Sequence, residues 1–436
     1  MPVINPHAAG IDIGSKSHFV CVAQDNVREF GVCTDDLHEL AGHLKAHQVQ
    51  TVAIESTGFY WQSLFTLLQD YGFEVILVNA RHVKNVKGHK TDVVDSKWLQ
   101  LLHSIGLLSN SFQPDFFTSK LRVYTRHRKH LIENASKYIA KMNKIFVLMN
   151  IQLSTVLRDI TGASGKRIIE AILSGERDPK NLAALASQQV KAKPEDIARA
   201  LTGDWREEHL FELRQSYDLY QHYWQMIRQT DQEIEKLLEQ KAAGSSPEQK
   251  YEPTPNKGYN KNDPDIDVGR LAFSLSGGVD LLQITGVGVG TVLTLMSEIG
   301  FDLSKFPTAK HFASWLGFTP NRKISGGKEL SSKTPPKTSP LSKAIRDAAN
   351  AVGNSKSRLD DFFRRLAYRR GRSIAVIATG RKLAVIIYHM LTRKQPFSYS
   401  FSYADETQQR SRKLKSVLKT IRRESFTATD LRPILG

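Results

Sequence analysis

The chain has few cysteines and no long apolar run. Only Cys21 and Cys33 occur among its 436 residues, and no CxxC motif is present. This excludes a disulfide-built scaffold and a cysteine-based structural zinc site, and it favours a reducing cytoplasm. No run approaches the ~20 apolar residues that a membrane-spanning helix requires. The N-terminus has no basic segment followed by a signal-like cleavage site, so we expect neither export nor a membrane partner.

The excess positive charge is confined to the C-terminal two-fifths of the chain. The formal net charge is +17, and the segment from Arg270 onward holds 29 of the 61 basic and 11 of the 44 acidic residues. That segment therefore carries +18 and the rest of the chain −1. Such a region binds polyanions, because its cations neutralise phosphates and release counterions. A basic surface that serves only solubility is the alternative.

Residues 8–115 alternate between β and α patterns. Three apolar runs (GIDIG, HFVCVAQ and VREFGVC) lie close enough together to form an antiparallel meander. Helix-like 37–47 then leads to a strand at 51–55 and to a helix that opens near 56–58. We expect Tyr60, Leu64, Leu67 and Leu68 on one face of that helix. The strand FEVILVNA, the basic loop RHVKNVKGHK and a further helix follow. Three strands, helix, strand, helix, strand, helix is the order of the RNase H-like fold.

Four carboxylates occupy the ends of these elements. Asp12 lies in the run AAGIDIG, Glu55 ends the run TVAIE, and Asp92 and Asp95 are spaced i, i+3 in KTDVVDSKWL. At ~4 Å and an effective dielectric near 20, each like-charge pair repels by about 4 kcal/mol. A divalent cation removes that cost, and Mg²⁺ prefers a few carboxylates with room left for phosphate oxygens. The pattern predicts a metal site for phosphoryl transfer on a nucleic acid, although any single aspartate at a strand end is more often a cap.

The remainder of the chain is expected to be mostly helical. Apolar residues recur at helical spacing from Leu131 to Met149 and again from Leu213 to Leu238, which predicts an antiparallel coiled coil with a small helical insert near 155–205. The predicted domains are an α/β catalytic domain at 1–117, the coiled-coil region at 118–241, a Pro/Gly/Ser-rich linker at 242–269, a compact helical domain at 270–393 and a basic tail at 394–436.

A glycine-rich segment opens the C-terminal domain. Gly286, Gly288 and Gly290 stand in LLQITGVGVGTVLTLMSEIG. The flanks are helical and no acidic partner follows at ~20 residues, so a dinucleotide-binding turn is disfavoured. A helix-hairpin-helix, whose turn exposes backbone N–H groups at a helix N-terminus to a DNA phosphate, fits better. A glycine-rich turn that serves only helix packing is the alternative.

Further along, Ser325 precedes two glycines in NRKISGGK, with Arg322, Lys323 and Lys328 close by. A serine that attacks a phosphodiester needs exposed backbone and nearby positive charge. By residue chemistry alone, a basic loop that contacts phosphates would look the same. The pair His43 and His47 has i, i+4 spacing without the glutamate of HExxH, and we expect it on a solvated helix face.

The run FFRRLAYRRGR mixes aromatic and basic side chains in a way that suits phosphate contacts and base stacking, although an amphipathic helix with a basic face would also explain it. Its four basic candidates are Arg364, Arg365, Arg369 and Arg370.

The motifs together resemble the DEDD transposases of bacterial insertion sequences, recombinases with a RuvC-like N-terminal domain and a serine-bearing C-terminal domain. GIDIGSKSHFV, AIESTGFYW and KTDVVDSKWL resemble the family's three acidic motifs, and ITGVGVGTVLTLMSEIG with FASWLGFTPNRKISGGK resembles its C-terminal motif. The resemblance covers nearly the whole chain. In one departure, Lys337-Thr338-Ser339-Pro340 stands where the family often has a Lys-x-Gly stretch.

The resemblance implies that Asp12, Glu55, Asp92 and Asp95 bind Mg²⁺, for which Mn²⁺ can substitute, and that Ser325 is the covalent nucleophile. It also implies a structured noncoding guide (bridge) RNA that pairs with double-stranded donor and target DNA, and homodimers that assemble into tetramers. The acidic site of one protomer would meet the serine of another. The expected location is the bacterial cytoplasm at the nucleoid.

The sequence thus favours an RNA-guided DNA transposase that cuts and rejoins DNA through a phosphoserine link. Two alternatives stay open. One is a RuvC-like nuclease that uses metal-activated water, with Ser325 only structural. The other is a noncatalytic RNA-binding scaffold that retains the fold.

Overall fold

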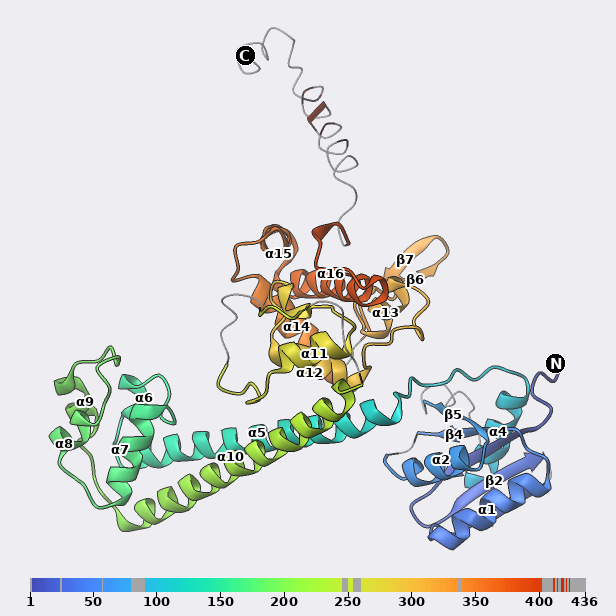
Figure 1. Cartoon of the computed structure of the whole chain (residues 1–436), viewed down its shortest axis with the longest axis horizontal. Helices are drawn as coiled ribbons and strands as arrows, with labels where there is room; N and C mark the ends of the chain where they lie inside the picture. The colour runs from blue at the N-terminus through green and yellow to red at the C-terminus, as the bar shows by residue number, and fades with distance from the viewer. Residues whose placement is uncertain are drawn as a thin grey trace. The chain divides into compact units, whose positions relative to one another are not determined.

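The structure is a computed structural model. It describes residues 2–23, 26–56, 58–79, 91–244, 250–253, 260–335 and 339–401, together with 411, 414, 417, 418, 421 and 423. Contacts between Cα atoms group the chain into two compact units, Met1–Gln113 and Pro114–Gly436 (Figure 1). The basic loop RHVKNVKGHK, residues 337 and 338, and most of the predicted tail lie outside the described residues.

The N-terminal unit is built on a five-stranded sheet in the order β3-β2-β1-β4-β5. The meander β1, β2 and β3 is antiparallel, and β4 and β5 run parallel to β1. The mixed α/β character expected of this part is therefore confirmed. The strands are β1 (Ala8–Ile13), β2 (His18–Ala23), β3 (Asn26–Phe30), β4 (Thr51–Glu55) and β5 (Glu74–Val78), and the helices are α1 (Thr34–Ala46), α2 (Trp61–Asp70) and α4 (Asp92–Ser104).

Alternation along each strand divides the side chains between two faces. One face packs against α1 and α2 and forms the larger core, in which Ile11 and Ile54 are fully buried. The opposite face receives α4, where Ala53 and Val78 pack with Leu99 and Leu102. The α4 face therefore takes the even-numbered residues of β1 and the odd-numbered residues of β4.

Helix α4 lies unusually close to β1 because Gly10 has no side chain. A Cβ atom at Gly10 would lie 2.3 Å from the backbone nitrogen of Gln100 and 2.7 Å from the carbonyl oxygen of Ser96. The Gln100 side-chain amide donates to the Ala8 carbonyl at 3.2 Å. These contacts fix both the depth and the direction of α4, which runs antiparallel to β1.

The C-terminal end of α4 is held by a buried histidine. His103 Nε2 lies 2.9 Å from the hydroxyl of Thr51 at the start of β4, and its carbonyl accepts from the Asn5 amide at 2.8 Å. Burial lowers the pKa of His103 to about 4. The imidazole is therefore neutral in the native state near neutral pH.

We predict that Gly10→Ala destabilises this unit. The added methyl meets backbone atoms that cannot rotate away, and overpacking of this kind costs about 1–3 kcal/mol of unfolding free energy. Gly42→Ala is the matched control, because a Cβ there meets nothing within 4 Å and Gly42 lies in exposed helix. The control should gain about 0.5–1 kcal/mol. Hydrogen exchange of peptides from β1 and α4 measures the stability of both variants. Equal protection in Gly10→Ala and Gly42→Ala would refute the packing argument.

A second prediction concerns acid stability. The native pKa of His103 lies near 4, whereas the unfolded value is ~6.5, so the unfolded state binds the extra proton between these values. The contribution of neutral His103 to the unfolding free energy is complete above about pH 6.5 and is lost as the pH falls toward 4. Proton linkage puts this contribution on the order of 3 kcal/mol. Urea unfolding between neutral and acid pH should give a steeper dependence for the wild type than for His103→Gln. Burial also lowers the pKa of His18, so the difference between the two proteins, rather than either slope alone, reports on His103.

Two long helices dominate the second unit. Helices α5 (Phe116–Leu148) and α10 (Glu207–Ala242) lie side by side. They are antiparallel, since Lys141 pairs with Glu212 at 3.2 Å while Arg128 pairs with Asp231 at 2.5 Å. The expected long helical hairpin is thus present.

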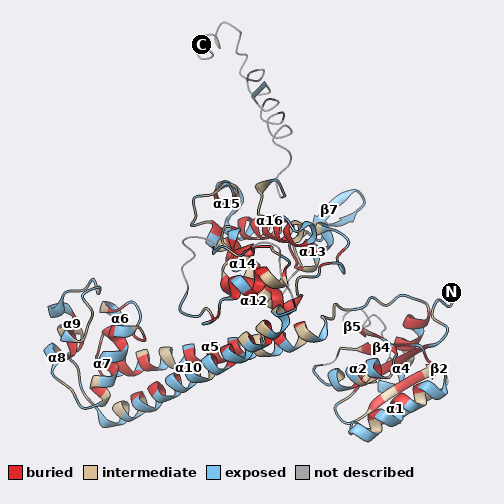
Figure 2. Cartoon of the chain, in the orientation of Figure 1, coloured by how far each residue is buried: buried red, intermediate tan, exposed pale blue. Residues whose placement is uncertain are grey.

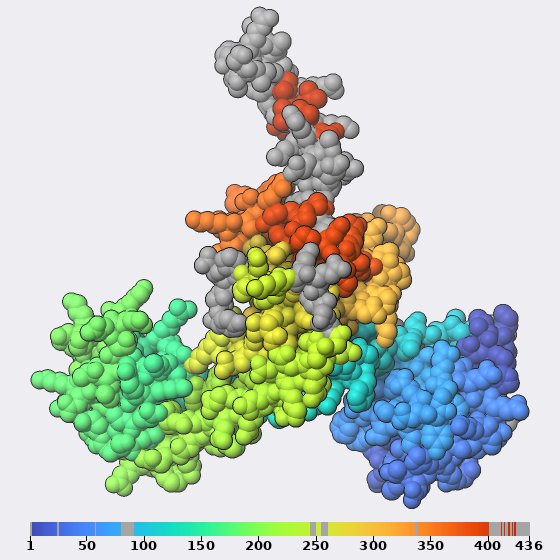
Figure 3. Space-filling model, viewed as in Figure 1, coloured from blue at the N-terminus to red at the C-terminus, as the bar shows by residue number. Residues whose placement is uncertain are grey.

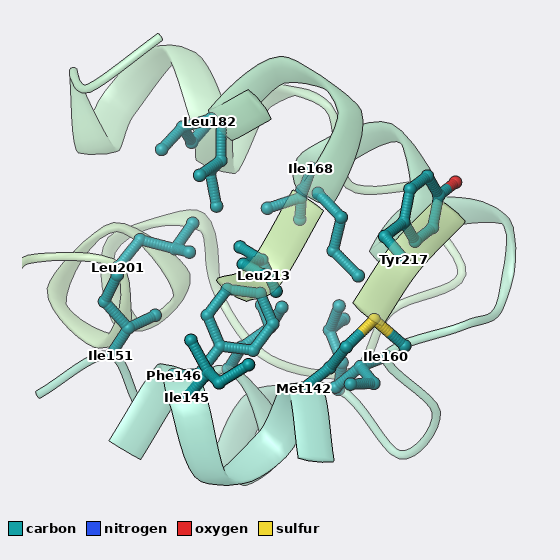
Figure 4. Close-up of a cluster of buried hydrophobic side chains, with 14 of the residues drawn as sticks. Met142, Ile145, Phe146, Ile151, Ile160, Ile168, Leu182, Leu201, Leu213 and Tyr217 are labelled. Atoms are coloured by element: carbon teal, nitrogen blue, oxygen red, sulfur yellow. The ribbon is translucent and has the colours of Figure 1, made fainter. Parts of the chain in front are cut away.

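A small helical head closes the far end of this pair, as the predicted insert requires. Figure 4 shows its core, in which Met142 and Phe146 of α5 and Leu213 of α10 pack around Ile168. The Tyr217 hydroxyl donates to Glu170 at 2.5 Å at the edge of this core. The head consists of α6 (Leu153–Val156), α7 (Ala163–Leu173), α8 (Pro179–Ala184) and α9 (Pro194–Ala200).

Arginines of α5 join the helical pair to the C-terminal helices. Arg126 makes a bidentate pair with the buried Glu298 of α12, at 2.9 and 2.8 Å. Arg128, itself buried, pairs with Asp231 and donates to the Asn262 carbonyl at 2.9 Å. The predicted boundaries at 241 and 269 therefore separate sequence patterns that belong to one compact unit.

The C-terminal part is mostly helical, as expected. Its helices are α11 (Val268–Leu275), η1 (Leu281–Gln283), α12 (Val289–Glu298), α13 (Ala309–Trp315), α14 (Pro340–Val352), α15 (Arg358–Arg370), α16 (Arg372–Arg393) and η2 (Tyr399–Phe401). A two-stranded sheet of β6 (Lys323–Ser325) and β7 (Lys328–Ser331), which the sequence interpretation did not include, interrupts them.

Helix α16 amends the expectation that no run could span a membrane. By its length and composition this helix could cross a membrane. It is the one such helix among the described residues. More than half of its most apolar 18-residue stretch is buried, and the helix contacts α13, α14 and α15 (Figure 2). A buried helix at the centre of a domain can be equally long and apolar, and the contacts of α16 identify it as a core helix.

Candidate active site

Asp12 and Glu55 lie side by side at the carboxyl end of two parallel strands. The register pairs Ile11 with Ile54, so the next residues of β1 and β4 are Asp12 and Glu55. Neighbouring strands lie ~4.8 Å apart, and residues in register point to the same face. Both carboxylates belong to the α4 face, and both are half-buried.

The direction of α4 brings the other two acids to the same end of the sheet. Gln100 lies beside Ala8, Ser96 lies beside Gly10, and the helix continues toward the end of β1 that bears Asp12. Asp92 and Asp95 form the first turn of α4, and Thr91 caps it by accepting from the Val94 backbone at 3.3 Å. Partial positive charge at a helix N-terminus stabilises carboxylates there.

The four acids suit a magnesium site in their donor atoms and in their position at one end of the α4 face of the sheet. All are oxygen ligands, Asp95 is half-buried and Asp92 is exposed, which leaves room for water and a phosphate. As placed, however, no group of three or more His, Cys, Asp or Glu side chains in the described part of the chain is gathered closely enough to hold an ion. The structure therefore brings the carboxylates to one end of one face without closing them around a point.

Ser325 lies at the tip of an exposed β-hairpin. It is the last residue of β6 and pairs with Lys328, the first residue of β7. The two residues between them, Gly326 and Gly327, have φ angles of 55° and 75°. A two-residue turn with positive φ at both positions matches the right-handed twist of the strands, which is why glycine is favoured there. The serine hydroxyl is thus presented to solvent on a defined turn.

The predicted cations near Ser325 are exposed with it. Lys323 begins β6, Lys328 begins β7, and Arg322 lies 4.0 Å from Glu329 in an exposed ion pair. Exposed pairs of this kind contribute little stability, so Arg322 remains available to a phosphate. The tip of the hairpin therefore combines a hydroxyl with positive charge.

Both halves of this arrangement fall within known transposase families. Residues 9–151, which include the four acids, match the DEDD family of IS110 elements described as "Transposase". Residues 280–364, which include Ser325, match the "Transposase IS116/IS110/IS902 family". The chain carries the transposase domains of the IS110/IS116 family.

The chain is also similar to the transposase for insertion sequence element IS1111A of Coxiella burnetii (strain RSA 493 / Nine Mile phase I). The two are 26% identical over 120 residues, which cover 26% of this chain and 33% of the relative. The aligned part thus spans about a third of the relative's length. The expectation of an insertion-sequence transposase type is confirmed by these matches.

Within the second transposase domain, the three glycines have different surroundings. Gly286 has a φ of 85°, and a Cβ there would lie 2.4 Å from the Ala348 carbonyl of α14, so this glycine serves helix packing. Gly288 is the N-cap of α12, and Gly290 is exposed in its first turn. The alternative of a packing turn accounts for Gly286, while a phosphate contact at Gly288 and Gly290 stays a prediction.

The basic run forms the C-terminal half of α15 in the same domain. Arg364 pairs with the buried Asp360 at 2.8 Å, whereas Arg365, Arg369 and Arg370 are exposed. Tyr368 among them is 94% exposed. Figure 3 shows α16 (red) between α15 (dark orange) and the residues around β6 and β7 (light orange). A cationic helix with an exposed aromatic ring suits a nucleic acid backbone and its bases.

Two details differ from the sequence expectations. Tyr60 does not lie on the buried face of α2: it precedes the helix, is 43% exposed and lies against the exposed Phe59, with ring centroids 4.6 Å apart. Phe65 takes its place in the core, because α2 starts three to five residues later than expected. His43 is half-buried against Phe30 and is therefore not on a fully solvated face.

Sequence reasoning missed the hairpin and the exposed aromatic pair. The hairpin had a local signal, since two glycines between Lys-Ile-Ser and Lys-Glu-Leu are a typical two-residue turn. The aromatic pair had none, because Phe-Tyr-Trp at the start of a helix looks like core. Its position four and five residues after Glu55 places it beside the carboxyl end of β4.

We predict that the hairpin depends on positive φ at its turn. A β-branched residue at Gly326 costs about 1–2 kcal/mol in the left-handed region, whereas asparagine tolerates it. Gly326→Val should therefore open the hairpin about 5- to 30-fold more often than Gly326→Asn. Tryptic cleavage after Lys323 and Lys328 in the native protein measures this opening, and equal cleavage of the two variants would contradict the turn assignment.

Proposed function

We propose that the chain is an RNA-guided DNA recombinase that transposes its own insertion sequence through a phosphoserine intermediate. The observation that carries the proposal is the presentation of Ser325 at an exposed glycine turn between cations, in a chain whose other unit places four carboxylates at one end of a five-stranded sheet. The strand order 3-2-1-4-5 and the parallel β4 and β5 support an RNase H-like fold.

In the proposed reaction the Ser325 hydroxyl oxygen attacks a DNA phosphorus atom. The new Oγ–P bond replaces one bridging P–O bond, and the proton lost by the serine neutralises the departing strand oxygen. Lys323, Lys328 and Arg322 offset the charge that develops on the phosphate oxygens. A hydroxyl of the new strand then reverses the step, so the bond energy is conserved and no high-energy cofactor is consumed.

The carboxylates Asp12, Glu55, Asp92 and Asp95 would hold Mg²⁺ or Mn²⁺, which supplies Lewis-acid activation of a phosphate oxygen when bound. The chain's own contribution there is placement: the β1–β4 register sets two carboxylates, and the first turn of α4 sets the other two. The exposed Phe59–Tyr60 pair, which follows the carboxyl end of β4, offers a surface on which a base can stack.

Three parts of the proposal rest on the family resemblance. They are the structured guide RNA, the homodimers that assemble into tetramers, and the meeting of the acidic site of one protomer with the serine of another. The +18 charge of the segment from Arg270 supports nucleic acid binding in general. Sequencing of RNA that copurifies with the protein tests the guide, which should map beside the gene.

We predict that Ser325→Ala abolishes strand transfer and leaves nucleic acid binding unchanged. The loss should exceed a thousandfold, since removal of a covalent nucleophile commonly costs a factor on the order of 10⁴ or more. Ser331→Ala, on β7 of the same hairpin, is the matched control and should retain activity. A suicide DNA substrate that traps covalent adducts gives the readout, and normal recombination by Ser325→Ala would disprove the nucleophile.

The same substrate separates the two alternatives. A RuvC-like hydrolase cuts with activated water, so it leaves no protein–DNA adduct in the wild type and loses cutting in Asp12→Asn. A noncatalytic scaffold shows neither cutting nor adduct, and Asp12→Asn changes only its stability. Asp70→Asn, an exposed change at the end of α2, controls for the loss of a charge.

A further inference from the structure

A cavity of about 660 Å³ opens at the base of the serine hairpin. We refer to it as the hairpin-base cavity. Its volume lies in the range of small-molecule sites, which is ~300–1,000 Å³. The residues that line it come from the segment before β6, the segment after β7 and the first half of α16: Phe318, Pro320, Ser332, Lys333, Thr334, Ser373, Ile374, Ile377, Ala378 and Arg381.

One wall is an apolar stripe of α16 that does not face the core. Ile374, Ile377 and Ala378 recur at i, i+3 and i+4, and Ile374 is 51% exposed. The core side of the helix is a separate stripe, in which Ala375, Thr379 and Leu383 are fully buried. Helices of globular proteins usually cover such a second apolar stripe, and here it lines a cavity.

The polar groups of the cavity are hydroxyls and cations. Ser332, Thr334 and Ser373 supply hydroxyls, and Lys333 and Arg381 supply positive charge. None of the described lining residues is acidic. The apolar wall formed by Ile374, Ile377 and Ala378 suits the face of a flat heterocycle, the hydroxyls suit its hydrogen-bonding edge, and the cations suit an attached phosphate.

The cavity also lies within reach of the proposed nucleophile. Ser325 pairs with Lys328, and Ser332 follows Lys328 by four residues along and just beyond β7. At ~3.3 Å per residue the cavity edge is about 13 Å from the serine. A DNA strand advances ~3.4 Å per stacked nucleotide, so this separation corresponds to a few nucleotides.

We propose that the hairpin-base cavity binds an unpaired nucleobase of the DNA strand whose phosphate Ser325 attacks. The inference rests on the proposed function for the identity of that strand. Capture of one base fixes the position of the strand relative to the hairpin tip, and so selects which phosphate meets the serine hydroxyl. A protein segment as occupant is disfavoured, because cations without carboxylates favour a polyanion.

The test uses the full-length protein and a single-stranded DNA of about 15 nucleotides that carries one internal 2-aminopurine. The fluorescence of this base rises when it leaves the stack of its neighbours. Wild type and Ser325→Ala should raise the emission equally, because the cavity does not need the nucleophile. Ala378→Trp, which fills the cavity, and Ile374→Glu, which places a negative charge at its mouth, should each weaken capture at least about fivefold, the lower end for loss of one stacked base.

Val123→Glu is the matched control. It makes a similar change of an apolar residue to glutamate at a 67% exposed site on α5, and it should behave as the wild type. Equal thermal midpoints of Val123→Glu and Ile374→Glu exclude misfolding. Capture that is unchanged in both Ala378→Trp and Ile374→Glu overturns the proposal. Unchanged capture together with loss of self-association in light scattering assigns the cavity to a second copy, which also overturns it.

The two proposals fail in different ways. Covalent adduct formation by Ser325→Ala would disprove the nucleophile while leaving the fluorescence result intact. Loss of adduct in Ser325→Ala with no effect of either cavity variant would leave the nucleophile standing and disprove the cavity assignment.

Discussion

The arrangement of the four carboxylates depends on the close approach of α4 to β1 at Gly10. Two backbone atoms of the helix occupy the space that any side chain at this position would need. With that contact in place, the Gln100–Ala8 hydrogen bond and the His103–Thr51 pair fix the far end of the helix. The direction of α4 then follows, and with it the position of Asp92 and Asp95 near Asp12. Four carboxylates from three elements share one end of the sheet because of one missing side chain.

The hairpin that bears Ser325 is positioned by a different kind of constraint. Ser325 has no packed surroundings, and every residue from 321 to 330 is exposed. Its orientation comes from the hairpin ladder and from two glycines in the left-handed region. Turn geometry defines the direction of the Ser325 side chain relative to the two strands, while the exposed tip has no packed surroundings that fix its position. At the base of the hairpin, residues before β6 and after β7 line one cavity together with α16.

Much of the fold and of the candidate site could be predicted from the sequence, and the predictions that failed did so for physical reasons. Asp12 and Glu55 could be placed because short apolar runs predict buried strands, and the ends of these runs are clear in the sequence. Strong 3.6-residue periodicity likewise revealed α5 and α10. The sequence could not show that the four acids are not gathered closely enough to hold an ion, because their separation depends on how α4 packs against the sheet. The β6–β7 hairpin was missed because its strands are three and four residues long, too short for alternation to register. Gly286 illustrates a third limit. The same sequence pattern fits a phosphate-binding turn and a helix-packing turn, and only the nearby Ala348 carbonyl in the structure shows that Gly286 serves packing.

The arginines that clamp α5 to α12 have a mechanical consequence. Helix α5 has 33 residues, so at ~1.5 Å per residue it is about 50 Å long. Its far end bears the helical head, and its near end is tied to α12 through Arg126 and Glu298 and to α10 through Arg128 and Asp231. Such a beam, clamped at one end, is a lever. A sideways force on the head becomes a torque on α12, whose N-cap is Gly288 and whose first turn contains Gly290. A force on the head is therefore transmitted through α5 to the C-terminal helices.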